Sequence, residues 1–184
     1  MQALSDSGHP GVAYQIAAQR TYPSWGYMVT HRATTIWELW NGDTTDPAMN
    51  SGNHLMLVGD LVNWFYKNLA GIRPDRAQPA FKHIIMRPTP VGDLCTVKAS
   101  YNSSYGKIAS DWKIAGGRLI CNLVVPPNAA ATVYVPAKDK AAVTETAKPA
   151  SELHGIKCLR TEAGAVVYEN DSGSYSFESR VSDS

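Results

Sequence analysis

The spacing of apolar residues changes from a helical period to a strand period near Phe81. Before this residue, apolar side chains recur every three or four positions, which is typical of amphipathic helices. After it, they alternate with polar side chains, as the strands of a sheet with one buried face require. We therefore expect an α+β chain with a helical region over residues 1–77 and a β-rich domain over residues 78–184.

The second region contains short stretches with strand alternation, separated by turns rich in glycine or proline. These stretches lie at 81–86, 96–103, 107–114, 118–125, 132–135, 165–169 and 174–178. A further short strand is expected around Val143. Many short strands with turn signals at this spacing are typical of an antiparallel β-sandwich.

In the first region the pattern predicts three helices, at 11–20, 24–29 and 54–70. The last is apolar on nearly every side, because a second apolar face accompanies its main stripe. The stripe comprises Leu57, Val58, Leu61, Phe65 and Leu69, and the second face Leu55, Val62 and Tyr66. A helix of this kind is normally buried between other elements. The chain also begins as if within a helix, so we expect further protein sequence before Met1.

Between these helices, residues 33–40 are β-branched and aromatic, which predicts an extended segment or a short strand. Residues 41–53 have the composition of a loop. After the third helix, Gly71 is a suitable residue to end it, and Pro74 prevents its continuation.

The charge balance argues against a strongly electrostatic partner. Lys and Arg total 17 and Asp and Glu total 16, a formal net charge of +1. We therefore expect neither a nucleic-acid-binding face nor a polybasic membrane patch. The most apolar window is interrupted by polar residues, so no membrane insertion is expected. No signal peptide is visible, and the sequence indicates no particular compartment.

Metal and cofactor signals are also missing from the sequence. The three cysteines, Cys95, Cys121 and Cys158, show no CxxC pair and no zinc-finger spacing with histidine. The histidines form no HxxxH pair, and no glycine-rich phosphate loop is present. We expect three unpaired thiols, no metal and no cofactor.

One carboxylate lies between two tryptophans, in a stretch that otherwise lacks charge: Glu38, flanked by Trp37 and Trp40. A sugar site needs a group that activates water and flat apolar faces that stack on pyranose rings. Desolvation by the indoles would raise the pKa of Glu38 towards the range useful for a general base. Alternatively, Glu38 lies on an exposed face beside buried aromatic residues.

His54 follows the loop and heads the third predicted helix. It could donate a hydrogen bond into a pocket at this helix end. Alternatively, it only caps or packs against the helix.

Three motifs occur in order in the first region: Tyr22–Met28 (YPSWGYM), Ala33–Glu38 (ATTIWE) and Met49–His54 (MNSGNH). Others follow in the second, including Val97–Tyr101, Ser110–Trp112 and Val125–Asn128. In this combination they resemble the C-terminal portion of bacterial α-L-rhamnosidases, glycoside hydrolase family 78. The resemblance covers about residues 8 to 137.

This resemblance implies the last helices of an (α/α)6 six-hairpin barrel followed by a C-terminal β-sandwich. It also implies hydrolysis of terminal α-L-rhamnose from glycosides or polysaccharides, with inversion. In such a mechanism one carboxylic acid protonates the leaving oxygen and one carboxylate activates water. The family pattern makes Glu38 the general base and His54 a sugar contact. Trp37 and Trp40 are expected as further substrate-binding residues because they flank Glu38 in the sequence.

The acid of the family pattern does not match any residue of this chain, so it is expected in a preceding segment that would be a partner. An alternative function remains open, a carbohydrate-binding or scaffold β-sandwich without catalysis.

Overall fold

A computed structural model describes residues 1–150, 153–162 and 164–180 of the chain. It divides the chain into two compact units, residues 1–65 and 66–184. The sequence places the boundary between two domains later, at residues 77 and 78, and this division stays a prediction. The last four residues of the predicted sandwich, 181–184, lie outside the described residues.

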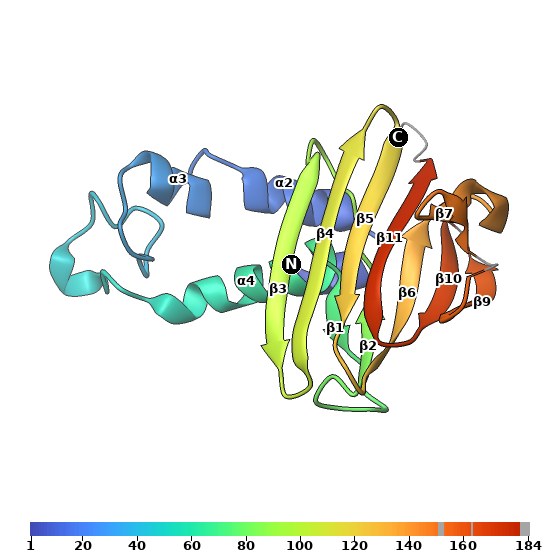
Figure 1. The fold of residues 1–184 in the computed structure, drawn as a ribbon. Coiled ribbons are helices and arrows are strands. Elements are labelled where there is room, and N and C mark those ends of the chain that lie inside the picture. The colour runs from blue at the N-terminus through green and yellow to red at the C-terminus, as the bar shows by residue number, and fades with distance from the viewer. Residues whose placement is uncertain (151–152, 163, 181–184) are drawn as a thin grey trace. The chain divides into compact units, whose positions relative to one another are not determined.

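The first unit consists of short helices joined by irregular segments (Figure 1). The helices are α1 (Gln2–Asp6), α2 (Pro10–Ala18), α3 (Trp25–Thr30), η1 (Pro47–Met49), η2 (Leu55–Val58) and α4 (Gly59–Trp64). Two of the predicted helices, at 11–20 and 24–29, are therefore confirmed within a residue or two. The Ser24 side chain caps α3 by accepting a hydrogen bond of 2.9 Å from the Tyr27 amide, as expected of a serine before a helix.

Of the two alternatives predicted for residues 33–40, an extended segment or a short strand, the short strand is wrong. This segment runs through bends and a turn, and no part of it forms a ladder with another strand. β-branched and aromatic residues favour strands only where a neighbouring strand supplies hydrogen bonds and packing. Here two backbone-to-backbone hydrogen bonds, between Ile36 and His54 and between Glu38 and Ser51, join it to a second irregular segment instead of a strand.

The helix predicted over residues 54–70 is present as a helical run with three geometries: 3₁₀ in η2, α in α4 and π in η3 (Phe65–Leu69). Its predicted apolar stripe is only partly buried. Leu61 and Leu69 are buried, whereas Leu57 and Phe65 are 40% and 42% exposed. Gly71 follows the run with a φ of 77°, which confirms its place at the helix end.

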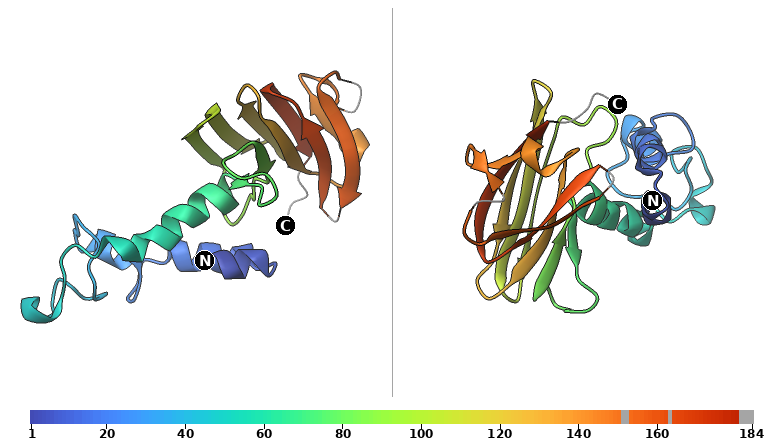
Figure 2. Two further views of the ribbon diagram at one scale, coloured as in Figure 1. Left: turned by 90° about the horizontal axis from the view of Figure 1, so that it is seen from below. Right: turned by 90° about the vertical axis from the view of Figure 1, so that its right-hand side faces the viewer.

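The second unit contains two sheets (Figure 1, and from two further sides Figure 2). The five-stranded sheet has the order β1 (Ile72–Pro74), β2 (His83–Met86), β6 (Ala130–Pro136), β10 (Ala165–Asn170) and β9 (Ile156–Glu162). The six-stranded sheet has the order β3 (Thr96–Ser103), β4 (Gly106–Ala115), β5 (Arg118–Val125), β11 (Gly173–Arg180), β7 (Val143–Glu145) and β8 (Lys148–Pro149). A β-sandwich is thus confirmed.

Every strand predicted from alternation is present, but the structure adds β1, β8 and β9. One strand pair also departs from the expected antiparallel arrangement, since β2 and β6 run parallel. The remaining pairs are antiparallel, including the continuous ladder through β3, β4, β5 and β11.

Alternate residues of β4 point into the sandwich, so that Ile108, Ser110 and Trp112 are fully buried. The two polar groups among them donate hydrogen bonds to the backbone at the end of the helical run. The Trp112 indole N–H donates to the Leu69 carbonyl at 2.8 Å, and the Ser110 hydroxyl donates to the Ala70 carbonyl at 2.6 Å. Carbonyls at a helix end have no partner within the helix, so these side chains satisfy them.

Candidate functional site

The candidate site lies in the first unit, where two irregular segments meet. The Glu38 amide donates to the Ser51 carbonyl at 3.0 Å, and the His54 amide donates to the Ile36 carbonyl at 2.6 Å. These two bonds hold the segment that carries Glu38 beside the segment that carries His54. The structure therefore brings together two residues that lie 16 positions apart in the sequence.

Side chains reinforce the same junction. The Leu39 amide donates to the Asn50 side-chain oxygen at 3.0 Å. The Thr35 hydroxyl donates to the Gly52 carbonyl. Asn, Ser and Gly are frequent in loops because their side chains bond nearby backbone or leave it free to turn. In this chain, that loop chemistry positions the carboxylate of Glu38.

The Glu38 carboxylate is held through one oxygen. The Ser51 amide donates to Oε2 at 3.0 Å, and Nδ1 of His54 lies 3.8 Å from the same oxygen. The Glu38 side chain is 45% exposed and that of His54 is 25% exposed. The carboxylate is thus anchored yet open to water. A group with this arrangement can accept a proton from a water molecule at hydrogen-bonding distance.

The two tryptophans next to Glu38 in the sequence make their described contacts with other residues. Gly42 lies against the Trp37 ring so closely that a Cβ there would be 2.6 Å from it, which only glycine avoids. Trp40 packs edge to face on Trp25, with ring centroids 5.6 Å apart. Both indoles therefore stabilise the segment around Glu38, and their contact with a sugar stays a prediction.

Sequence reasoning did not identify the Ser51 amide as a partner of the carboxylate. The only available signal was the run of loop residues Asn50, Ser51 and Gly52, which says that the backbone turns but not where its amides point.

A second carboxylate–histidine pair lies in the second unit. Oδ2 of Asp75 is 2.9 Å from Nδ1 of His83, and Oδ1 accepts a hydrogen bond of 2.9 Å from the Ala77 amide. These contacts, chiefly the Ala77 amide and then His83, hold the pKa of Asp75 below its usual value of 3.8. Nε2 of His83 lies 3.3 Å from the Thr132 hydroxyl. The pair joins the turn before β2 to the five-stranded sheet.

Over residues 1–150, 153–162 and 164–180, no cluster of three or more His, Cys, Asp and Glu side chains could hold a metal ion. The thiols of Cys95, Cys121 and Cys158 are free. No helix in this part of the chain has both the length and the apolar content needed to cross a membrane.

Comparison with protein families matches both parts of the chain. The six-hairpin glycosidase domain of bacterial α-L-rhamnosidases matches residues 1–69. The C-terminal domain of bacterial α-L-rhamnosidases matches residues 71–149.

Two relatives match over nearly the full chain. An α-L-rhamnosidase of Streptomyces avermitilis is 37% identical over 182 residues, which cover 96% of this chain and 17% of the relative. An α-L-rhamnosidase of Formosa agariphila is 31% identical over 186 residues, covering 98% of this chain and 20% of the relative. The chain thus spans about a fifth or less of the length of these relatives.

Solved structures give the same result. The α-L-rhamnosidase of Streptomyces avermitilis, complexed with L-rhamnose, superposes with a TM-score of 0.86 at 35% identity, over 97% of this chain and 17% of that one. The α-L-rhamnosidase from Dictyoglumus thermophilum superposes with a TM-score of 0.85 at 36% identity, over 98% of this chain and 20% of that one. The expected resemblance is confirmed: this chain belongs to the bacterial α-L-rhamnosidase family of glycoside hydrolases, and it corresponds to the end of the six-hairpin domain followed by the C-terminal β domain.

Proposed function

We propose that this chain supplies the general base, Glu38, of an inverting α-L-rhamnosidase. The observation that carries the proposal is the anchored, water-accessible carboxylate of Glu38 beside His54. A base must be fixed in direction but must still reach a water molecule, and this carboxylate combines both properties. Because Oε2 accepts the Ser51 amide, Oε1 is the oxygen that would take the proton.

In the proposed reaction, Glu38 removes a proton from water while the water oxygen attacks the anomeric carbon of the rhamnose. The bond to the leaving oxygen breaks on the opposite face, and a carboxylic acid protonates that oxygen. The two carboxyl groups of an inverting enzyme lie roughly 6.5–9.5 Å apart, which leaves room for the water. We propose that the acid belongs to the remainder of the six-hairpin domain, the partner of this segment.

His54 would position the sugar relative to the base. Its Nδ1 faces Glu38 at 3.8 Å, so the opposite ring nitrogen, Nε2, is the atom available to a sugar hydroxyl. Trp37 and Trp40 would complete the sugar-binding surface and exclude solvent. The substrate proposed is a terminal α-L-rhamnoside, supported by the bound L-rhamnose of the Streptomyces avermitilis relative.

The test uses a hybrid enzyme in which residues 1–184 replace the matching segment of the Streptomyces avermitilis relative. Glu38→Gln should lower kcat on an aryl α-L-rhamnoside by at least about 10²-fold, the usual contribution of a positioned base. KM should change little, because proton removal belongs to the transition state. Asp43→Asn makes the same charge change at an exposed neighbouring residue and should leave kcat close to that of the unsubstituted hybrid. Near-normal kcat in the Gln variant would contradict the proposal.

The chain by itself should not hydrolyse this substrate, because the acid is proposed to lie outside it. Clear turnover by the purified 184-residue chain would contradict that part of the proposal.

A further inference from the structure

The outer face of the six-stranded sheet carries an excess of positive charge. On β3, β4, β5 and β11, the residues that alternate with the buried ones point outward. Their charged members are Lys98, Lys107, Asp111, Lys113, Arg118, Glu178 and Arg180. Five cations therefore share this face with two carboxylates, although the whole chain has a formal net charge of only +1.

The cations on this face are not equally compensated. Lys98 lies 3.7 Å from the carboxylate of Asp111, and Arg118 forms an ion pair with Glu178. Among the described residues, Lys107 has no carboxylate partner. An uncompensated cation in a hollow is a candidate contact for an anionic group of a ligand.

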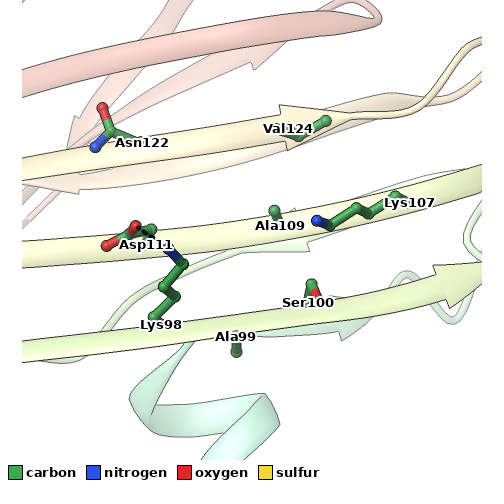
Figure 3. A pocket seen from close by; sticks show the side chains of 8 residues that line it. All are labelled: Lys98, Ala99, Ser100, Lys107, Ala109, Asp111, Asn122 and Val124. Atoms are coloured by element: carbon green, nitrogen blue, oxygen red, sulfur yellow. Dashed lines mark ion pairs between the residues drawn. The ribbon is translucent and has the colours of Figure 1, made fainter.

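A hollow of about 270 Å³ lies over β3, β4 and β5 on this face (Figure 3). The small side chain of Ala109 forms its floor, and the longer side chains of Lys98, Lys107, Asp111 and Asn122 surround it. The two lysines reach it from different strands, and the dashed line in Figure 3 marks the ion pair of Lys98 with Asp111. The hollow thus offers ammonium, amide and carboxylate groups around an apolar floor.

A second hollow of about 430 Å³ continues from the first, since both are lined by Lys107 and Val124. It extends over Pro126 and reaches the hydroxyl-bearing residues Ser172 and Ser174 at the start of β11. The two hollows are therefore adjacent, with Lys107 at their junction, and together they are called the groove. The larger hollow lies within the range of about 300–1,000 Å³ that is typical of small-ligand sites.

We propose that this groove binds an acidic oligosaccharide, with a sugar carboxylate at Lys107. Two adjacent hollows fit a chain of sugar units better than a single ion, and their serine and asparagine side chains can bond sugar hydroxyls. None of the residues that line the two hollows is aromatic, so a neutral sugar would have no ring on which to stack. Charge, not stacking, is the recognition element. That the anion is a saccharide rests on the proposed function.

The experiment measures binding of trigalacturonic acid to the immobilised 184-residue chain by surface plasmon resonance. The methyl ester of the same trisaccharide removes the charge but keeps the shape, and inorganic phosphate supplies charge without a sugar. Lys107→Gln is compared with Lys113→Gln, which makes the same charge change on the same strand outside the groove. The two lysines lie six positions apart on the strand, which corresponds to about 20 Å.

We expect the acid to bind, and the ester and phosphate to bind more weakly. Lys107→Gln should weaken binding of the acid at least about threefold, in the range of a solvent-exposed ion pair, and Lys113→Gln should leave it nearly unchanged. Absence of binding, equal binding of the ester or of phosphate, or equal losses in the two lysine variants would overturn the proposal. Glu38→Gln should retain full binding, so the groove and the proposed catalytic role can fail independently of each other.

Discussion

Replacing Trp112 with alanine should destabilise the second unit by about 3–5 kcal/mol, the usual cost of removing a large aromatic side chain from a core. The Trp112 side chain is fully buried, so its whole surface contributes to the free energy gained by removing it from water. Its indole N–H also donates to the Leu69 carbonyl at 2.8 Å. Alanine removes the shorter of two hydrogen bonds to that carbonyl, which keeps only the bond of 3.5 Å from the Thr89 amide, so the loss of this bond adds to the packing cost within the same range.

Trp112→Phe helps to separate the two contributions, because phenylalanine keeps one aromatic ring in the core but removes the N–H donor. The lost hydrogen bond should cost about 0.5–1.5 kcal/mol, because the Thr89 amide still donates to the Leu69 carbonyl at 3.5 Å. The order of stability should therefore be wild type, then Phe, then Ala.

Hydrogen exchange measured by mass spectrometry on peptides from β5 and β11 gives the free energy of opening of the second unit alone. This probe is needed because the chain has two units and a single unfolding curve would mix them. Trp40→Ala, in the first unit, is the control and should leave exchange in β5 and β11 unchanged. A loss below about 1 kcal/mol in Trp112→Ala would refute the packing argument, because core aromatic residues cost several times more.

The remaining predictions concern association, thiol reactivity and pH. Leu55 and Met56 are 69% and 77% exposed, so the chain should self-associate. The variant with serine at both positions should have a lower mass by light scattering, and a monodisperse wild-type monomer would contradict this. Burial raises the pKa of Cys121 to about 12, so a thiol reagent at mildly alkaline pH should modify the exposed Cys95 at least about tenfold faster than Cys121. Equal rates would refute the register of β5, which points Cys121 into the core. The lowered pKa of Asp75 stabilises the fold above its usual value of 3.8, and this stabilisation is lost as the pH falls through the lower folded value. Asp75→Asn should therefore lower the urea midpoint at neutral pH but not in strong acid, and an equal effect at both would argue against the ion pair.

The strands that the sequence predicts best are those with unbroken alternation. Residues 96–103 and 118–125 were predicted with the bounds that β3 and β5 have, because one face of each strand packs on the core and the other meets solvent. Strand β9 was missed because its alternation is interrupted. Its register with β10 shifts at Leu159, which has no partner residue in β10. The inward and outward positions before and after Leu159 therefore do not follow one alternation.

The candidate site was harder to predict than the sandwich. Local sequence identifies Glu38 as a carboxylate among aromatic residues, and the family motifs single out His54, but no periodicity relates the two. Their proximity depends on backbone hydrogen bonds between irregular segments, and such bonds follow from tertiary structure, not from propensity. For the same reason the sequence does not predict which residues the two indoles contact. In the structure, Trp37 packs on Gly42 and Trp40 packs on Trp25.

The most direct test of Glu38 as the general base is rescue of its removal by azide. Azide is an anion that attacks carbon without losing a proton, so it makes a base unnecessary. In the hybrid enzyme, Glu38→Ala should lose hydrolysis of an aryl α-L-rhamnoside and regain turnover on addition of azide, and the product should be the β-rhamnosyl azide with inverted configuration. If azide restored nothing while the variant remained folded and bound rhamnose, or if the azide product retained the α configuration, Glu38 would not be the base.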